Sequence, residues 1–483
     1  MPGSAFKGRF AGGTPSSPCL NCVLASRAIG HRAETAALAI AARKNLEGTP
    51  MPDIPKPLSR RRAMAGAGSA ALAAGAALTS VAARAAPTLN NTAGWPEQPP
   101  DPADLPPNIP PWMQAPGRPL TPYGQPSPHE SAVVRVPTVL TPTELASWNF
   151  TPLQYLHGTI TPNGLHFERL HAGTPDIDPA QHRLLVHGMV KRPLVLSMDD
   201  LLRYPSVSRI HFLECSGNTL TEWRKPTAKS VQVTHGLLSC AEWTGVPVAA
   251  VLDDAGVDSK AGWALAEGAD AAAMARSIPI AKLWDDALLA YAQNGEMLRP
   301  SQGYPLRLLL PGYEGNTNVK WLRRLKFATA PFETYEETAY YIELMKNGKA
   351  RQFNFVMEAK SVITFPSAGQ TLTRPGFCQI SGLAWSGSGR VSRVDVSTDG
   401  GRSWRSATLQ QPVLPRALTR FRFNWEWHGE PAVLQSRCLD ETGYVQPTLA
   451  QLVAARGLNS TYHMNAIQSW QIAPTGEVIN VHA

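Results

Sequence analysis

The spacing of apolar and polar positions first sets apart a region of mixed secondary structure. From about residue 143 to 329, short apolar runs such as Arg183–His187 and Pro305–Pro311 alternate with turn signals and with brief helical patterns such as Pro247–Ala255. Short apolar runs bounded by turns are typical of strands, and strands mixed with helices indicate mixed sheets. This region is predicted to be an α+β domain.

The pattern changes to a strict period of two from Val362 onward. Polar and apolar positions alternate in Gln379–Trp385, Val391–Val396 and Arg420–Trp425, and a turn stands at Asp399–Gly401. Regularly spaced strands over roughly 100 residues are typical of an immunoglobulin-like β-sandwich. An all-β second domain is therefore predicted.

Proline defines the segment before these domains. It is frequent between 87 and 128, which rules out a helix or a central strand and predicts an extended arm. The arm contacts a partner or serves as a passive linker. The predicted organisation is a leader (1–86), the arm (87–142), the α+β domain (143–335), a charged connector (336–361) and the sandwich (362–483).

The net charge of the 483 residues is +8, and the place of the basic residues along the chain decides which binding partners this charge favours. Residues 1–85 contain eleven Lys and Arg against three acidic residues, so the rest of the chain is formally neutral. A neutral body releases few counterions from a nucleic acid. Nucleic-acid binding is therefore not expected.

The basic leader has the features of an export signal. Ser59-Arg60-Arg61-Arg62 precedes an Ala-rich run that reaches about Val81, and the small residues at 83–85 suit cleavage. This pattern predicts a twin-arginine signal peptide and a periplasmic protein that folds before export. A membrane anchor is the alternative, but the run is rich in Ala and Gly, and no membrane association is predicted. The true start codon stays open.

Cysteine usage singles out one candidate ligand. Cys215 follows a strand-like run at 207–212 and stands at a turn, where a thiolate suits a soft, high-valent metal. A buried, inert cysteine is the alternative. Cys378 and Cys438 are expected to be free thiols rather than a disulfide. The sequence contains no CxxCH, so no covalent c-type haem is expected in it.

Several motifs resemble the sulfite oxidase family of molybdenum enzymes. Glu214–Asn218 (Glu-Cys-Ser-Gly-Asn) resembles the segment that supplies the family's metal ligand. Phe167–His171 and Asn318–Arg324 are similar to two further family motifs. Gly382–Gly387 and Val394–Gly401 resemble the family's C-terminal sandwich, which there forms the dimer interface.

The resemblance spans about residues 152–470 in the same order. Ile160–Arg169 and Leu310–Asn316 further resemble the molybdenum subunit of sulfane dehydrogenases in Sox-type sulfur oxidation. The fold that this implies is a sulfite-oxidase-type molybdopterin-binding domain followed by an immunoglobulin-like dimerisation domain.

The resemblance also implies a cofactor, molybdenum held by molybdopterin, with Cys215 as the protein ligand to the metal. The implied cofactor-binding residues are Phe167, Arg169, His171, Cys215, Asp270, Gln302, Arg307, Asn318, Val319 and Lys320. Arginine suits bidentate contacts with phosphate, and lysine adds a point charge. The implied catalytic residues around the substrate are Arg169, Tyr341 and Arg456.

Three positions depart from the sulfite oxidase pattern. Gln302 replaces a histidine, Tyr340 replaces an aspartate and Leu170 replaces an asparagine. The pocket is therefore not expected to be tuned for bare sulfite.

The activity that the resemblance implies is oxidation of sulfane sulfur bound to a carrier protein. Electrons are expected to pass to a c-type cytochrome subunit, in a heterotetramer that self-associates through the sandwich. The alternative activity is oxidation of free sulfite to sulfate. A non-catalytic homologue and a structural sandwich protein are the other classes, and the presence of Cys215 and Arg169 argues against both.

Overall fold

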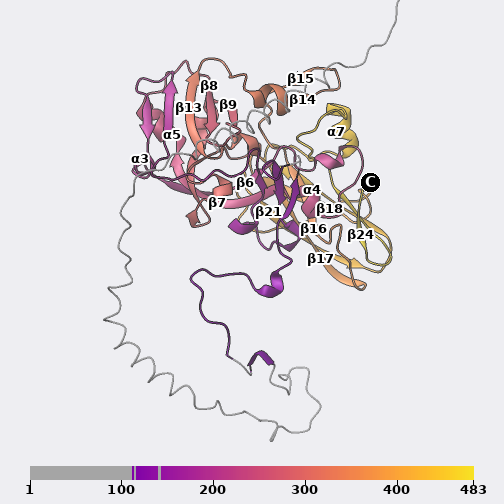
Figure 1. The fold of residues 1–483 in the computed structure, drawn as a ribbon. Helices are drawn as coiled ribbons and strands as arrows, with labels where there is room; N and C mark the ends of the chain where they lie inside the picture. Colours follow the sequence, from indigo (N-terminus) through magenta and orange to yellow (C-terminus); the bar gives the residue numbers. More distant parts are fainter. Residues whose placement is uncertain (1–110, 114–115, 140–142) are drawn as a thin grey trace, which may run out of the picture. The chain divides into compact units, whose positions relative to one another are not determined.

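The computed structural model describes residues 111–113, 116–139 and 143–483. Residues 122–483 form one compact unit, in which both predicted domains lie (Figure 1). The predicted leader lies outside the described residues, as does the first part of the predicted arm.

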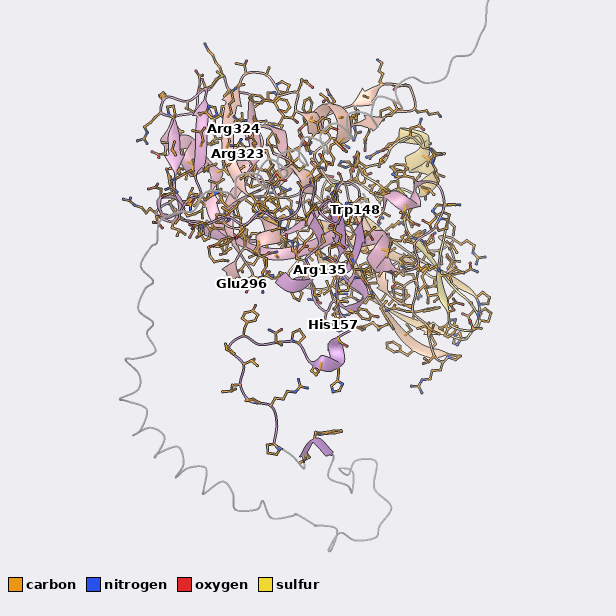
Figure 2. All side chains as sticks on the ribbon, in the orientation of Figure 1. Arg135, Trp148, His157, Glu296, Arg323 and Arg324 are labelled. Carbon is orange, nitrogen blue, oxygen red and sulfur yellow. The ribbon has the colours of Figure 1, made fainter. Side chains whose placement is uncertain are left out.

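In the predicted arm, the described residues 116–132 are exposed, and Tyr123 contacts the predicted α+β domain. The Tyr123 hydroxyl donates to Glu296 Oε2 at 2.9 Å and accepts from Arg299 Nη2 at 3.0 Å, next to the labelled Glu296 in Figure 2. Arg299 also lies over the Tyr123 ring, 5.8 Å from its centroid.

The end of the predicted arm belongs to a small sheet. Its strands β1 (Val136–Val139), β2 (Ser147–Phe150) and β3 (Glu168–Arg169) are paired in that order. Both pairings are antiparallel, and β3 carries the Phe-Glu-Arg-Leu-His motif to the edge of the site.

Two five-stranded sheets build the predicted α+β domain. One has the order β11-β10-β7-β6 with β12 also paired to β10, and the other has the order β5-β4-β13-β8-β9. Because β13 is parallel to β4 and antiparallel to β8, the prediction of mixed sheets is confirmed. The strands are β4 (Leu184–Gly188), β5 (Leu194–Leu196), β6 (Val207–Glu214), β7 (Leu238–Pro247), β8 (Trp263–Gly268), β9 (Ala275–Pro279), β10 (Leu288–Gln293), β11 (Glu296–Met297), β12 (Arg307–Leu309) and β13 (Leu322–Ala328).

Short helices cover these sheets. They are α3 (Met198–Leu201), α4 (Val231–His235), α5 (Val248–Ala255) and α6 (Ile280–Asp285). In α5, the residues at 248, 251, 252 and 255 are buried, which is the spacing of one helix face. Gly256 has a φ of 62° and ends the helix in the left-handed conformation that glycine adopts readily. The helix predicted at 247–255 is confirmed.

The predicted connector contains a π-helical turn and a short hairpin. The turn is η9 (Glu336–Tyr340), and the hairpin consists of β14 (Glu343–Leu344) and β15 (Ala350–Arg351). The sandwich begins at Lys360, two residues before the predicted boundary.

The second domain is a sandwich of two sheets, as predicted. The sheets have the orders β16-β17-β21-β20 and β19-β18-β22-β23-β24. The strands are β16 (Lys360–Phe365), β17 (Gly376–Trp385), β18 (Val391–Ser397), β19 (Arg405–Ser406), β20 (Thr408–Leu409), β21 (Thr419–Trp427), β22 (Ala432–Asp440), β23 (Ser469–Ile472) and β24 (Val478–Val481), with helix α7 (Leu449–Arg456) between β22 and β23.

Alternation along the strands builds the sandwich core. In β21, Phe423, Trp425 and Trp427 are buried, whereas Asn424 and Glu426 between them are exposed. The core cluster also takes in Phe212, from the other domain. Strand β6 therefore contributes to the packing of the sandwich.

Cys378 and Cys438 in the sandwich are buried free thiols, which confirms the expectation from the sequence. Within the described part of the chain, every helix is too short or too polar to cross a lipid bilayer.

Candidate cofactor and metal site

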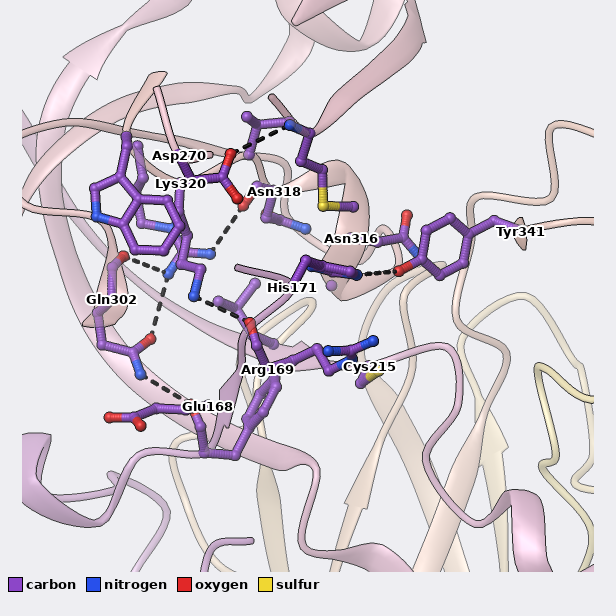
Figure 3. A pocket seen from close by; sticks show the side chains of 17 residues that line it. Glu168, Arg169, His171, Cys215, Asp270, Gln302, Asn316, Asn318, Lys320 and Tyr341 are labelled. Atoms are coloured by element: carbon purple, nitrogen blue, oxygen red, sulfur yellow. Dashed lines mark hydrogen bonds between the residues drawn. The ribbon is translucent and has the colours of Figure 1, made fainter. Parts of the chain in front are cut away.

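One cavity gathers residues from segments that are far apart in the sequence (Figure 3). It is lined by Phe167, Glu168, Arg169, His171, Leu213, Cys215, Asp270, Met274, Gln302, Arg307, Gly315, Asn316, Asn318, Val319, Lys320, Trp321 and Tyr341. The structure thus brings together every predicted cofactor-binding residue and two of the three predicted catalytic residues, Arg169 and Tyr341.

Strand β6 carries Cys215 to the cavity at its carboxyl end. The Cys215 N–H donates to the Leu237 carbonyl at 3.0 Å, and the Cys215 carbonyl accepts from the Asn218 N–H at 2.8 Å. Burial raises the pKa of the Cys215 thiol to about 11. A bound cation reverses such a shift, because it stabilises the thiolate.

A metal bound to Cys215 would need further ligands that the surrounding side chains do not supply. In the residues that the structure describes, no group of three or more His, Cys, Asp and Glu is arranged to hold a metal ion. A single thiolate beside a cavity suits a metal whose remaining ligands come from a cofactor.

A buried arginine, Arg307, and a partly buried lysine, Lys320, line the same cavity. Burial, with Arg307 nearby, lowers the pKa of Lys320 to about 7, and burial alone lowers the pKa of Arg307 to about 9. Lys320 Nζ donates to the carbonyls of Arg169 and Ser301, at 3.1 and 2.8 Å. An anion in the cavity would offset the desolvation of these cations and return both pKa values toward their usual range.

Two buried polar atoms of the cavity lining have no hydrogen-bond partner among the described residues, which favours binding of a polar, anionic ligand. Arg307 Nε and Asn316 Oδ1 are buried without a hydrogen-bond partner among the described residues. Buried polar groups are nearly always paired, so unpaired ones in a cavity call for a ligand or water. The donor set fits a phosphate-bearing cofactor.

Hydrogen bonds fix the other residues of the cavity. Gln302 Nε2 donates to the Phe167 carbonyl at 2.8 Å, and Asp270 Oδ1 accepts from the Met274 N–H at 3.2 Å. Asn318 Oδ1 accepts from the Leu310 N–H at 2.6 Å. Gln302 and Asn318 also accept hydrogen bonds from the Arg307 guanidinium, through their carbonyl oxygens at 3.0 and 3.1 Å, so these contacts hold the walls of the cavity in place.

Tyr341 and His171 meet at one end of the cavity. The Tyr341 hydroxyl lies 3.2 Å from His171 Nε2. Burial, together with Arg169 and Lys320, lowers the pKa of His171 to about 3. Burial raises the pKa of Tyr341 well above its usual value. Both side chains are therefore neutral at pH 7, and Tyr341 keeps its hydroxyl proton for donation.

The structure does not bring Arg456 into this cavity. Its guanidinium forms ion pairs with Glu343 and Glu358, and it donates to the His463 carbonyl at 3.0 Å. The side chain is 8% exposed, and these partners hold it away from the cavity lining. The expected contact of Arg456 with substrate is thus not formed here, and its catalytic role stays a prediction.

Other residues of the cavity were missed from the sequence. They are Glu168, Leu213, Met274, Gly315, Asn316 and Trp321. Asn316 and Trp321 lie within the recognised motifs and their neighbours, so those motifs contained a signal for them. Met274 reaches the cavity through the turn after β8, for which the sequence pattern gives no signal.

Comparisons with known proteins agree with this geometry. The family model described as "Oxidoreductase molybdopterin binding domain" matches residues 171–336, and "Mo-co oxidoreductase dimerisation domain" matches residues 351–470. The crystal structure of the sulfane dehydrogenase SoxCD from Paracoccus pantotrophus is similar, with a TM-score of 0.76 and 46% identity. That match covers 78% of this chain and 97% of the other.

Curated relatives include sulfite oxidases and nitrate reductases. Mitochondrial sulfite oxidase from Mus musculus is 33% identical over 340 residues, which cover 64% of this chain and 62% of the relative. An NADH nitrate reductase from Hordeum vulgare is 33% identical over 336 residues, which cover 60% of this chain and 36% of the relative. The chain thus spans less than two thirds of the length of these relatives.

The two family models cover most of both domains. They also cover every residue that lines the cavity except Phe167, Glu168, Arg169 and Tyr341. The cation-rich cavity beside Cys215 suits the phosphate and the metal of the cofactor that the family binds. The chain therefore belongs to the sulfite oxidase family of molybdenum–molybdopterin oxidoreductases.

Proposed function

We propose that the chain is the catalytic subunit of a periplasmic sulfane dehydrogenase, which oxidises sulfane sulfur bound to a carrier protein. The observation that carries this proposal is the 46% identity with the sulfane dehydrogenase structure across nearly all of that chain, with Cys215 beside a cavity lined by Arg307 and Lys320. The departures at Gln302 and Leu170 from the sulfite oxidase pattern support the same choice.

The cavity residues have separate roles in this proposal. Arg307 and Lys320 would hold the anionic groups of molybdopterin, and Asp270 and Asn318 would line the cavity that receives it. Cys215 binds the molybdenum. When bound, the molybdenum cofactor supplies two-electron oxidation of the substrate sulfur.

The chain's own side chains prepare that reaction. Arg169 is a cation at the Cys215 end of the cavity, so it attracts an anionic sulfur substrate and stabilises charge that develops on it. The Tyr341 hydroxyl can donate a hydrogen bond to a group bound in the cavity, and neutral His171 keeps that hydroxyl in place. Burial of these groups excludes water, which strengthens each of these interactions.

Oxidation of free sulfite is the second candidate, since sulfite oxidases are among the relatives. The test is molybdenum analysis of the purified protein, followed by cytochrome c reduction with sulfite and with a carrier protein that bears a persulfide. We expect a higher kcat/KM for the persulfide carrier. Activity with sulfite alone would establish the alternative, and a protein that binds no molybdenum would refute both.

Arg307→Ala and Lys320→Ala are each expected to lower molybdopterin affinity about 10- to 100-fold, because each removes a charge-assisted hydrogen bond. The ratio of activities with the two substrates should stay unchanged per bound cofactor. Quantifying released molybdopterin measures the effect. Arg323→Ala, which changes a half-exposed arginine outside the cavity, is the control. Full occupancy in both cavity variants would refute the assignment.

The proposed electron acceptor is a c-type cytochrome subunit. The sequence contains no CxxCH, so the two electrons leave through another protein. The twin-arginine motif at 59–62 supports export to the periplasm, where such cytochromes occur. We further propose self-association through the sandwich, which gives a heterotetramer.

Deletion of residues 87–128 is expected to weaken co-purification of the cytochrome about 10-fold or more and to leave molybdenum bound. Residues 116–132 of the arm are exposed, and the prolines of its sequence stiffen it, so it loses little entropy on docking. Pull-down and metal analysis measure the two effects. Tyr123→Ala serves as a milder variant, because it keeps the arm and removes its contacts with Glu296 and Arg299. Unchanged co-purification after the deletion would refute the docking role.

A further inference from the structure

Strand β6 is a wall shared by the cavity and the sandwich. Successive side chains of a strand point to opposite faces. Leu213 and Cys215 line the cavity, whereas Phe212 packs in the sandwich core. β6 is also an edge strand of its sheet, and its Phe212 N–H donates to the Arg416 carbonyl of the sandwich domain at 3.1 Å. The residue before the metal ligand, Glu214, thus faces the sandwich.

Glu214 is a buried carboxylate that is held by sandwich residues. It is 0% exposed. Its Oε2 accepts from Trp385 Nε1 at 2.6 Å, and its Oε1 accepts from Lys360 Nζ at 3.0 Å and from Asn218 Nδ2 at 2.9 Å. Lys360 also donates to Thr219 Oγ1 at 2.7 Å. A buried charge without partners is very unfavourable, so Glu214 cannot leave this position without disrupting the contacts.

The opposite side of the same peptide is equally close-packed. A β-carbon at Gly315 would lie 2.9 Å from the Glu214 carbonyl oxygen and 3.3 Å from Cys215 Cα. The turn at Gly315 therefore fits against the backbone of the metal ligand. Cys215 is held between this turn and the sandwich.

We propose that Lys360 and Trp385 are positioning residues, which fix the orientation of Cys215 toward the metal through Glu214. The sandwich then helps to orient the metal ligand, in addition to providing the surface for the proposed self-association. The chain of contacts is short, because only one peptide bond separates Glu214 from Cys215. The inference rests on the assignment of Cys215 as the metal ligand in the proposed function.

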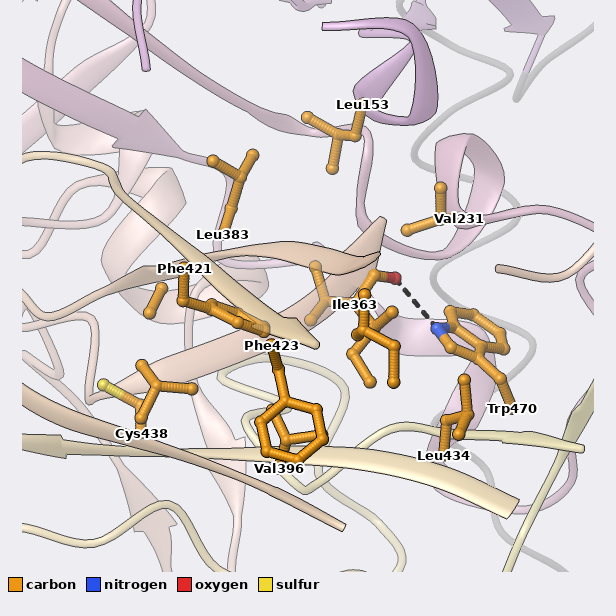
Figure 4. Packing of buried hydrophobic residues seen from close by; sticks show 14 of the residues in the cluster. Leu153, Val231, Ile363, Leu383, Val396, Phe421, Phe423, Leu434, Cys438 and Trp470 are labelled. Atoms are coloured by element: carbon orange, nitrogen blue, oxygen red, sulfur yellow. Dashed lines mark hydrogen bonds between the residues drawn. The ribbon is translucent and has the colours of Figure 1, made fainter. Parts of the chain in front are cut away.

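The competing explanation is that these contacts only join the two domains. Loss of a contact would then loosen the fold and leave the metal's surroundings as they are. A matched pair of variants separates the two explanations. Trp470, like Trp385, is 0% exposed in the sandwich, and its Nε1 donates to the Ile363 carbonyl at 2.9 Å, away from Glu214 (Figure 4).

The experiment compares Trp385→Phe with Trp470→Phe in the full, cofactor-loaded protein. Each variant loses one buried indole hydrogen bond. We expect Trp385→Phe to shift the thiolate-to-metal charge-transfer absorption and the EPR spectrum of the one-electron-reduced metal, and to lower kcat about 10- to 100-fold. Trp470→Phe should keep the wild-type spectra and kcat.

A second variant tests the same point without an unpaired buried charge. Glu214→Gln combined with Lys360→Met removes both charges, so the fold should persist while the spectra shift. If Trp385→Phe does not fold, the spectra of this double variant decide between the two explanations. Wild-type spectra in the folded variants, or equal shifts in Trp470→Phe, would overturn the inference. Failure of the proposed function itself is distinct, because the wild-type protein would then bind no molybdenum or would oxidise sulfite alone.

Discussion

Cys215→Ser is expected to reduce turnover to the background of the assay while the fold persists. A serine hydroxyl is a poor ligand for a soft, high-valent metal, and its proton is far harder to remove than that of a thiol. Loss of the proposed protein ligand should exceed the roughly 100-fold effect that follows loss of a supporting residue. Turnover of the sulfur substrate and the thiolate-to-metal charge-transfer absorption measure the change.

The control is Cys378→Ser in the sandwich. Cys378 and Cys215 are each 8% exposed, so the two substitutions disturb packing to a similar degree. Cys378 lies in β17, outside the cavity lining. We expect this variant to keep its activity and its metal spectrum. Wild-type turnover in Cys215→Ser would remove Cys215 from the metal and would contradict the proposed site.

Local patterns predicted the main strands well, and they placed Cys215 at the end of one of them. The strand at 207–212 was expected from its apolar run, and β6 extends it by two residues to Glu214. Chain order and motifs then predicted that Arg169 and Lys320 share a site, although 151 positions separate them. Such motifs work because several backbone groups and side chains of one short segment contact the same ligand.

Side chains whose position depends on distant carboxylates could not be predicted in this way. Arg456 was expected at the substrate, but Glu343 and Glu358 attract its guanidinium, and neither belongs to a recognised motif. Lys360 was assigned to a charged connector, yet it is 1% exposed because Glu214 neutralises it. In both cases a pairing across domains decides the position, and periodicity carries no information about such pairings.

Arg276→Met is expected to lower the free energy of unfolding by about 3–5 kcal/mol, because it leaves the buried carboxylate of Glu337 without its cation. Arg276 is fully buried in β9. Its Nε donates to Glu337 Oε1 at 2.7 Å, and its Nη2 donates to Glu314 Oε1 at 3.0 Å. The guanidinium also lies 4.9 Å from the centroid of the Tyr341 ring, so the loss affects the end of the cavity.

Thermal unfolding of cofactor-loaded protein, followed by circular dichroism, measures this loss. The control is Arg323→Met, which removes a half-exposed arginine from Glu267 while Arg324 still pairs with that carboxylate, in the surface region labelled in Figure 2. Such a surface pair contributes about 1 kcal/mol or less. Equal losses in the two variants would contradict the importance of the buried pair. Glu337→Gln combined with Arg276→Met should recover part of the stability, since Glu337 is the carboxylate that loses its cation, whereas Glu314 keeps His463 at 3.3 Å.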